Sequence, residues 1–377
     1  MSEPLILPGL NPTRTAIIHD WLITDRGGER VLECLCNIFP QATLFALFRV
    51  PGSQAPAIER MNTKSTFIEK MPYVRQFYRY YLPLFPRAIE SLDLTGFDLI
   101  VSSSHCAAKG VRPPPGSRHI CYCHTPMRYA YELFDEYFPP SRRFMHFAAR
   151  LMMPRVRRWD IQSSSRVGRF LANSANTAGR ISRYYGRDSL ILHPPVDTNF
   201  FTPDTMKPSS EYLLTVSALV PYKRVDRGIE AATMAGIEYV IVGSGPEQPR
   251  LEKIQPSTAR FVGNVSPEEL RSLYRGCLAF VLPGEEDFGI APVEAQACGR
   301  PVIALALGGA LETVIEGKTG AFFRDENPRA LAETIDKVRQ IEFNTEAVRE
   351  HSLKFSRPNF ESGIKIMIAE FWNEGRC

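Results

Sequence analysis

The chain has 377 residues, which is enough for two domains with separate hydrophobic cores. Its 44% apolar and 23% charged residues are typical of a globular protein, and no apolar run approaches the ~20 residues of a membrane-spanning helix. No positive charge precedes Arg14, so we expect no signal peptide and a cytoplasmic protein. The eight cysteines lack paired zinc-ligand spacing, which favours reduced thiols over a metal site.

The net charge of +4 conceals a difference between the two halves of the chain. Residues 1–187 contain 25 Lys and Arg against 14 Asp and Glu, a net charge of +11. Residues 188–377 contain 20 against 27, a net charge of −7. This asymmetry predicts two domains that meet different partners.

Near the N-terminus, a strand is predicted at residues 15–21 (TAIIHDW), followed by a helix from Glu29. Gly27 and Gly28 stand before this helix, where a backbone without side chains lets a phosphate or a sugar approach closely. A tight strand-to-helix turn could use the same glycine pair without binding any ligand.

Further strands of the first half are predicted at 97–102, 118–124 and 170–174, the last of them closing this half. His124 ends one of these strands, and open α/β sheets bind ligands at the C-terminal ends of their strands. A purely structural role is the alternative for a single histidine.

A basic segment lies between the last two of these strands. Residues 141–169 contain eight arginines and one acid, Asp160, interleaved with Phe, Met and Trp. Nucleic-acid binding, a solvated face and contact with a membrane surface are all compatible with this composition. Pro154 interrupts the helical period, which predicts two helices here.

In the second half, predicted strands and helices alternate, which indicates a parallel α/β sheet. Lys223 and Arg224 lie on the loop after the strand at 212–219, where cations could stabilise a diphosphate leaving group. Two solvated loop charges are the alternative. The segment GSGPE at 243–247 lacks the third glycine of a dinucleotide fingerprint, which argues against NAD binding.

Residues 278–320 carry the clearest functional signal. A strand, the turn PGEED and a helix starting near Ala291 are followed by a second strand and a second helix. Glu286 on the loop and Glu294 in the first helical turn are eight residues apart, and carboxylates suit a hydroxyl-rich ligand. Helix amides favour an anion, so the pattern describes a nucleotide sugar. Otherwise Glu294 only complements the helix dipole and Glu286 is solvated.

The run EDFGIAPVE at 286–294 resembles the two-glutamate signature of retaining glycosyltransferases of the GT-B fold, family 4 type. The later segments ACGRPVIA, GG and GKTG fit the same family. The resemblance implies two Rossmann-like α/β domains facing a cleft. Residues 1–193 would bind the acceptor, residues 194–357 the nucleotide sugar, and a helix at 358–377 would return to the first domain.

The resemblance also assigns roles to single residues. Lys223 and Arg224 would stabilise the departing nucleoside diphosphate, Glu286 would hold the transferred sugar, and Glu294 would hold the ribose diol. His124 would approach the sugar from the first domain and, with Lys223, Arg224 and Glu286, form the catalytic set. The remaining donor-binding positions are Gly27, Gly28, Gly263, Val265, Phe288, Gly289 and Ile290.

One position departs from the family, because Ala218 stands where an arginine is common. Arg224 could supply the missing charge. The expected reaction is a retaining hexosyl transfer without a metal or other cofactor. The segments CHTPMRY and LVPYKR most resemble bacterial mannosyltransferases of cell-surface polysaccharide assembly.

This resemblance makes GDP-mannose the first expected donor, with UDP-sugars second. A lipid-linked or saccharide acceptor is expected, and the alternative is a non-catalytic nucleotide-sugar-binding scaffold. The basic first half then predicts a cytoplasmic protein held peripherally at the anionic inner face of the cell membrane. The absence of a recognisable binding module argues against nucleic acid as a partner.

Overall fold

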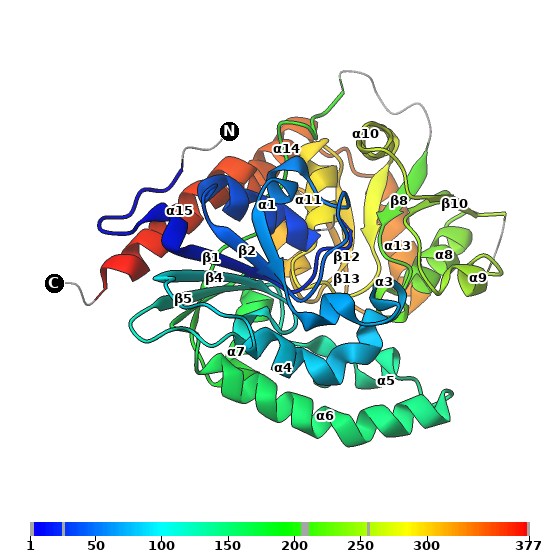
Figure 1. The fold of residues 1–377 in the computed structure, drawn as a ribbon. Coiled ribbons are helices and arrows are strands. Elements are labelled where there is room, and N and C mark those ends of the chain that lie inside the picture. Colours follow the sequence, from blue (N-terminus) through cyan, green and yellow to red (C-terminus); the bar gives the residue numbers. More distant parts are fainter. Residues whose placement is uncertain (1–3, 25–26, 205–210, 255–256, 375–377) are drawn as a thin grey trace. The chain divides into compact units, whose positions relative to one another are not determined.

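The computed structural model describes residues 4–24, 27–204, 211–254 and 257–374 (Figure 1). The chain divides into two compact units, one formed by Met1–Pro195 with Pro358–Cys377 and the other by Val196–Arg357. Each unit is an α/β domain built on a parallel sheet, which confirms the α/β class predicted from the sequence.

The first unit contains a seven-stranded sheet with the strand order β3-β2-β1-β4-β5-β6-β7. All neighbouring strands pair in parallel, with Ile17 of β1 opposite Val101 of β4. The order reverses direction between β1 and β4, and ligands bind at such a reversal in open α/β sheets. The strands are β1 (Thr15–His19), β2 (Thr43–Ala46), β3 (Asn62–Ser65), β4 (Leu99–Ser104), β5 (Arg118–Cys123), β6 (Arg169–Ala172) and β7 (Ser189–Ile191).

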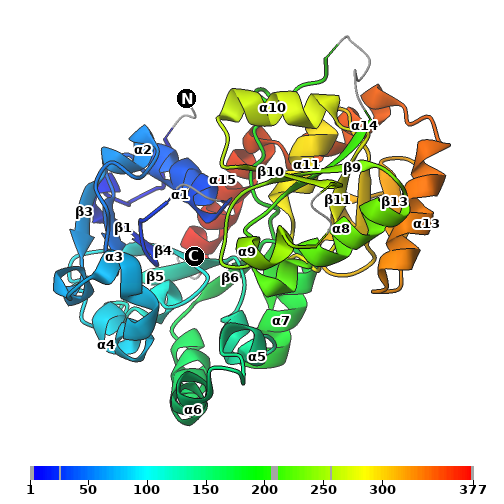
Figure 2. The same cartoon turned by 90° about the vertical axis from the view of Figure 1, so that its right-hand side faces the viewer.

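Helices cover both faces of this sheet (Figures 1 and 2). Ile17 packs with α1 and α15 on one face, whereas its neighbour Ile18 packs with α4 and α6 on the other, because successive strand residues point to opposite faces. The helix α15 follows the second unit in the chain but buries its apolar side in the first. The helices are α1 (Gly27–Ile38), α2 (Pro56–Glu59), α3 (Val74–Phe77), α4 (Phe85–Glu90), α5 (Phe134–Tyr137), α6 (Arg143–Ser164), α7 (Ala175–Tyr185) and α15 (Arg357–Asn373).

The second unit contains a six-stranded parallel sheet with the order β10-β9-β8-β11-β12-β13. Its direction reverses between β8 and β11. The strands are β8 (Tyr212–Val216), β9 (Glu238–Val242), β10 (Ala259–Gly263), β11 (Ala279–Leu282), β12 (Val302–Leu305) and β13 (Gly320–Phe323).

The helices of this unit also cover both faces of their sheet. α8 and α13 pack on one face, and α10 and α11 pack on the other (Figure 2). The helices are α8 (Val225–Met234), α9 (Gln248–Leu251), α10 (Pro267–Gly276), α11 (Ile290–Ala297), α12 (Ala310–Thr313), α13 (Pro328–Arg339) and α14 (Thr345–Ser352).

Two expectations about the first unit are wrong. The strand at 170–174 does not close this half, because the short edge strand β7 follows it and pairs with β6. Residues 143–164 form one helix that contains Pro154 rather than two helices. The buried side chains of α6, among them Met153 and Val156 on either side of the proline turn, pack against the unit and keep the helix continuous.

A buried ion pair joins α6 to the segment that follows β4. The ammonium of Lys109 donates to Asp160 Oδ1, and both side chains are almost inaccessible to solvent. The hydroxyls of Tyr131 and Tyr185 donate to Asp160 Oδ2 at 2.8 and 2.9 Å. The Lys109 ammonium also lies 5.2 Å from the centre of the Tyr185 ring, so both charges are well satisfied.

We expect Lys109→Met to destabilise the protein by about 3–5 kcal/mol, because it leaves the Asp160 carboxylate buried without its cation. Arg112→Met is a matched control, since Arg112 pairs with Glu90 from an exposed position and should cost less than about 1 kcal/mol. Urea unfolding of both variants measures the difference. Equal losses would mean that the buried pair is not needed to hold α6.

Candidate functional site

In the second unit, Lys223 and Glu286 lie on the loops that follow β8 and β11. Lys223 ends the 3-10 helix Pro221–Lys223, and its ammonium donates to Glu286 Oε1. The two side chains are 15% and 22% exposed, so a ligand can still reach them. The structure therefore brings two of the predicted catalytic residues into contact where the strand order reverses.

Two glycines allow the surrounding loops to approach this pair. A Cβ at Gly284 would lie 2.9 Å from the Lys223 carbonyl oxygen, closer than side chains tolerate. A Cβ at Gly309 would lie 2.3 Å from Phe288 Cα, and the Gly309 amide donates to the Glu286 carbonyl at 2.9 Å. The backbone on both sides of Glu286 is thus held by close contacts that only glycine permits.

Arg224 adopts a left-handed backbone conformation with φ 51° and ψ 38°, which is uncommon for a residue with a side chain. Such strain is often found at functional sites. Its guanidinium lies 3.4 Å from Asp226 Oδ1 and 3.6 Å from Glu326 Oε2. Arg224 therefore stands next to Lys223 in the chain but directs its charge toward two acids of its own unit.

Glu294 does not lie in the first turn of its helix, contrary to expectation. Gly289 has φ 88° and allows α11 to begin at Ile290, so Glu294 is the fifth helical residue. The residue is 8% exposed, and its Oε2 accepts a hydrogen bond from the Tyr274 hydroxyl at 2.8 Å. Tyr274 lies on α10 and is fully buried. Tyr274 was not predicted from the sequence, because a tyrosine at helical spacing is typical of a core.

The other predicted donor-binding residues of this unit take different positions. Gly263 ends β10 and Val265 follows it, at the edge of the sheet two strands from β8. The side chain of Phe288 is buried in a small cluster with Val293 and Phe355, so a ligand could reach only its backbone. Ile290 starts α11, whose N-terminal amides favour an anion.

In the first unit, His124 follows β5 and its ring lies beside the start of α1. Its Nε2 is 2.8 Å from Ser103 Oγ, and the same hydroxyl is 3.2 Å from His19 Nδ1. A Cβ built on Gly28 would be 3.7 Å from the His124 ring, so Gly28 adjoins the ring as well. Burial lowers the pKa of His124 to about 3, and the neighbouring histidines His105 and His19 lower it further. The ring is therefore neutral at ordinary pH.

Asp20 anchors the loop that follows β4. Its buried carboxylate accepts hydrogen bonds from four consecutive backbone amides, those of residues 105–108, at 2.6–2.9 Å. His105 Nδ1 lies 3.1 Å from Oδ2. Burial alone would raise the pKa of Asp20, but the two nearby histidines and these amides lower it below its ordinary value. Asp20 falls inside the strand predicted at 15–21, and no local pattern indicates this role, since the amides come from residues about 85 positions away.

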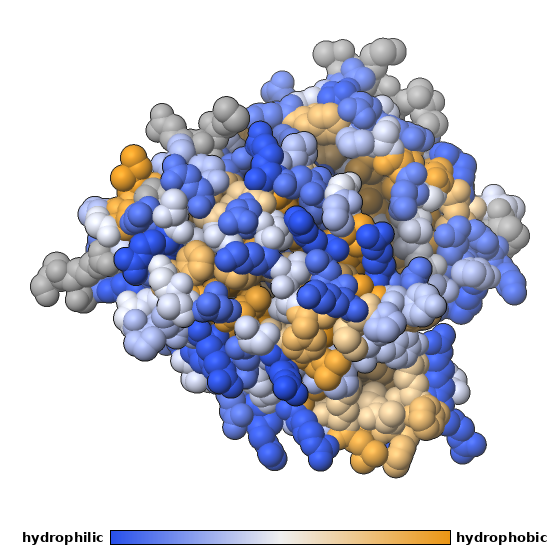
Figure 3. Space-filling view, in the orientation of Figure 1, coloured by the Kyte–Doolittle hydropathy of each residue, from blue (hydrophilic) through white to orange (hydrophobic). Residues whose placement is uncertain are grey.

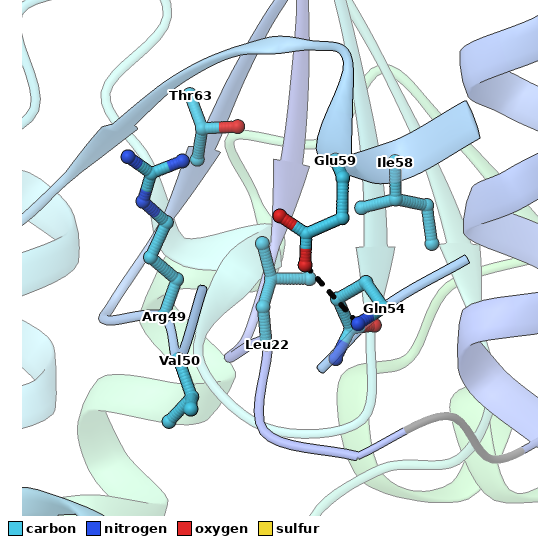
Figure 4. Close-up of a pocket in the computed structure, with 7 residues that line it drawn as sticks. All are labelled: Leu22, Arg49, Val50, Gln54, Ile58, Glu59 and Thr63. Atoms are coloured by element: carbon cyan, nitrogen blue, oxygen red, sulfur yellow. Dashed lines mark hydrogen bonds between the residues drawn. The ribbon is translucent and has the colours of Figure 1, made fainter. Parts of the chain in front are cut away.

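A small pocket in the first unit contains none of the predicted site residues (Figure 4). The carboxylate of Glu59 lies in it and accepts hydrogen bonds from the amides of Gly52 and Gln54 at 2.9 and 3.1 Å. These two hydrogen bonds hold the loop that precedes α2 in its conformation. The pocket is lined by Leu22, Arg49, Val50, Gln54, Ile58, Glu59 and Thr63.

Models of two known families match the two regions that contain these clusters. Residues 27–200 match the model of Glycosyltransferase Family 4, and residues 198–352 match the model of glycosyl transferases group 1. The region that matches family 4 contains Gly28 and His124, and the region that matches group 1 contains Lys223, Glu286 and Glu294.

Curated relatives match part of the chain. It is 30% identical over 243 residues to D-inositol 3-phosphate glycosyltransferase of Geodermatophilus obscurus, covering 56% of this chain and 53% of that protein. It is 34% identical over 200 residues to an uncharacterized glycosyltransferase of Methanocaldococcus jannaschii, covering 50% and 52%. The chain thus spans about half the length of the curated relatives it matches.

Solved structures match over nearly the whole chain. Anabaena HepE in complex with UDP has a TM-score of 0.69 at 16% identity, covering 94% of this chain and 100% of that one. Sucrose-phosphate synthase of Thermosynechococcus elongatus has a TM-score of 0.69 at 17% identity, covering 95% and 99%. These similarities confirm the predicted GT-B fold.

Proposed function

We propose that the protein is a retaining glycosyltransferase that transfers a hexose from a nucleotide sugar to an acceptor. The contact of Lys223 with Glu286 carries this proposal, because it joins a phosphate-binding cation to a hydroxyl-binding carboxylate where the strand order reverses. Anabaena HepE, which has a similar fold, was solved with UDP and with UDP-glucose, which supports a nucleotide-sugar donor.

Lys223 and the N-terminal amides of α11 would stabilise the leaving group. As the bond between the sugar and the diphosphate breaks, negative charge grows on the phosphate oxygens. The Lys223 ammonium and the amides near Gly289 and Ile290 are fixed cationic or dipolar groups that can offset this charge without a metal ion. Glu286 would accept hydrogen bonds from the hydroxyls of the transferred sugar and would exchange part of its contact with Lys223 for them.

Glu294 would hold the ribose diol of the nucleotide. Its carboxylate is oriented by the Tyr274 hydroxyl, which restricts the side chain before any ligand arrives. Arg224 has a smaller role in this proposal, because Asp226 and Glu326 already balance its charge. Lys223 is therefore the main cation for the diphosphate.

GDP-mannose is the donor we propose first, on the resemblance of the segments around His124 and Lys223 to bacterial mannosyltransferases. A UDP-sugar is second, and the UDP complexes of Anabaena HepE favour it. The acceptor would be a lipid-linked or saccharide substrate of cell-surface polysaccharide assembly. A nucleotide-sugar-binding scaffold without turnover is the alternative function.

Donor binding and turnover separate these possibilities. GDP-mannose or UDP-glucose should raise the melting temperature, since a ligand that binds only the native state stabilises it. Incubation with the labelled donor and a bacterial lipid extract should give a product that keeps the anomeric configuration of the donor by NMR, also in the presence of EDTA. Binding without product would favour the scaffold, and an inverted or EDTA-sensitive reaction would contradict the proposed mechanism.

The two glutamates should give different phenotypes, because they would contact different parts of the donor. Glu294→Ala should weaken binding of the free nucleotide about tenfold or more, as expected for a lost charged hydrogen bond. Glu286→Ala should leave this affinity within about threefold but lower turnover about a hundredfold. Calorimetry with GDP and UDP, and a turnover assay, measure the two effects.

Glu285→Ala is a matched control, since this carboxylate precedes Glu286 on the same loop and should change neither quantity by more than about twofold. Equal losses of nucleotide affinity in Glu286→Ala and Glu294→Ala would contradict the assignment of the two residues.

The exposed side of α6 supports peripheral binding to a membrane. Phe144, Phe147 and Leu151 are 87%, 62% and 58% exposed, and Arg155 and Arg158 follow them at the same helical spacing. Figure 3 shows hydrophobic side chains gathered over this helix along the lower edge of the molecule. No described helix is long and apolar enough to cross a membrane. We infer that this stripe contacts the anionic inner face of the cell membrane.

Not every arginine of α6 is available for such contact. Arg157 donates to the carbonyl of Ala130 and lies 6.0 Å from the centre of the Tyr131 ring, so it belongs to the packing of the domain. A test of membrane binding must therefore leave Arg157 unchanged.

We expect Arg155→Glu with Arg158→Glu to lower the affinity for phosphatidylglycerol-containing vesicles at least about tenfold, since each basic residue near such a surface contributes ~1 kcal/mol. Phe144→Ser with Phe147→Ser should have a similar effect through lost apolar insertion. Co-sedimentation at low and high salt measures both. Arg329→Glu with Arg339→Glu, on α13 of the other unit, is the charge control. A wild-type protein that stays in the supernatant at low salt would contradict membrane binding.

A further inference from the structure

Four polar side chains of the first unit form a continuous line from α1 to the end of β5. Glu29 Oε1 lies 3.9 Å from His19 Nε2, and His19 Nδ1 lies 3.2 Å from Ser103 Oγ. Ser103 Oγ in turn lies 2.8 Å from Nε2 of His124. Glu29, His19 and Ser103 are all buried, and His19 and Ser103 are completely inaccessible. Neither the family matches nor the proposed function assigns a role to Glu29, His19 or Ser103.

The hydroxyl of Ser103 couples the two histidines. It carries one proton, so it can donate to only one of the two ring nitrogens that face it. If it donates to His19 Nδ1, its oxygen is left to accept a proton from Nε2–H of His124. If it donates to His124 instead, His19 must be the donor. The position of the proton on one ring therefore determines its position on the other.

Glu29 selects between these two arrangements. Within the described part of the chain, His19 Nε2 is buried without a hydrogen-bond partner, and the Glu29 carboxylate is the charge that faces it. Burial alone would raise the pKa of Glu29, but His19 lowers it below its ordinary value, so the carboxylate is ionised. When the His19 ring carries a single proton, the nearby negative charge favours that proton on Nε2, which leaves Nδ1 as the acceptor.

We propose that Glu29, through its charge, and His19 and Ser103, through hydrogen bonds, form a relay that fixes His124 as its Nε2–H tautomer and leaves its Nδ1 as an acceptor for a sugar hydroxyl. The three residues are positioning residues that act through His124. The inference rests on the proposed function for the identity of the ligand, but not for the tautomer itself.

The surroundings of His124 suit this role. Burial keeps the ring neutral, so one nitrogen remains an acceptor at ordinary pH. Gly28 has no side chain to crowd the ring. A Cβ at this position would already lie in van der Waals contact with Cε1 and Nε2 of His124. Asp20 holds the loop after β4 through four amides, so the relay is not needed to anchor that loop.

NMR of the full chain labelled with ¹⁵N-histidine tests the tautomer directly and requires no substrate. Wild-type His124 should be protonated at Nε2 and unprotonated at Nδ1. Ser103→Ala and Glu29→Leu should each shift His124 toward the Nδ1–H form or a mixture. Ser102→Ala is the matched control, because Ser102 is the adjacent residue of β4 and bonds a different histidine, the buried His119, at 2.8 Å. The control should leave His124 unchanged.

Binding measurements test the consequence. Ser103→Ala should weaken binding of the sugar nucleotide about tenfold relative to wild type, and leave binding of the free nucleotide within about twofold. Ser102→Ala should change neither, while both variants should lose similar unfolding free energy.

A wild-type His124 protonated at Nδ1, or a Ser103→Ala variant whose tautomer does not change, would overturn the relay. Equal effects of Ser103→Ala and Ser102→Ala on sugar-nucleotide binding would overturn its role toward the sugar. If no sugar nucleotide binds the wild type but the tautomer is as expected, the relay stands and the proposed function fails.

Discussion

Parallel strand pairing places the C-terminal ends of all strands of a sheet at one edge, and both clusters of polar residues depend on this constraint. In each unit the strand order reverses once, between β1 and β4 or between β8 and β11. The loops that leave these strands diverge to opposite sides, so side chains at their starts can face a ligand together. His19 and Ser103 meet at the first reversal, and Lys223 and Glu286 meet at the second.

Both clusters contain carboxylates that are satisfied before any ligand binds. Asp20 accepts four amides, Glu294 accepts the Tyr274 hydroxyl, and Glu286 accepts the Lys223 ammonium. A buried charge without such partners would cost several kcal/mol, so these contacts are needed for the fold to hold acidic groups at its edges. They differ in exposure, however. Asp20 is completely buried and serves structure, whereas Glu286 is partly exposed and can exchange its partner for a ligand.

The arginines of the first half fall into two groups that composition alone does not separate. Arg157 and Arg166 donate to backbone carbonyls inside the domain, and their charges contribute to packing. Arg155 and Arg158 project from the exposed side of α6 beyond a stripe of large apolar residues. An amphipathic helix of this kind is suited to an anionic surface because the apolar and the electrostatic contributions act on the same face.

Local sequence patterns determined the features that depend on neighbouring residues. The apolar runs of β1, β4, β8 and β11 mark buried parallel strands, and the run EDFGIAPVE indicates a loop and a helix N-terminus with two glutamates. The glycines at 284 and 309 belong to this pattern too, although only the structure shows which backbone they approach. The roles predicted for the glutamates and for His124 in sugar transfer remain predictions.

Only the tertiary structure decided the contacts between distant parts of the chain. Ser103 lies 84 residues from His19 and 21 from His124, and Tyr274 lies 20 from Glu294. These residues come into contact because of the strand order and the helix packing, which no local periodicity encodes. The edge strands β3 and β7 escaped prediction for a related reason, since edge strands need no continuous apolar run. The continuity of α6 through Pro154 likewise depends on the domain against which its buried side packs, because the tertiary contacts offset the hydrogen bond that proline removes.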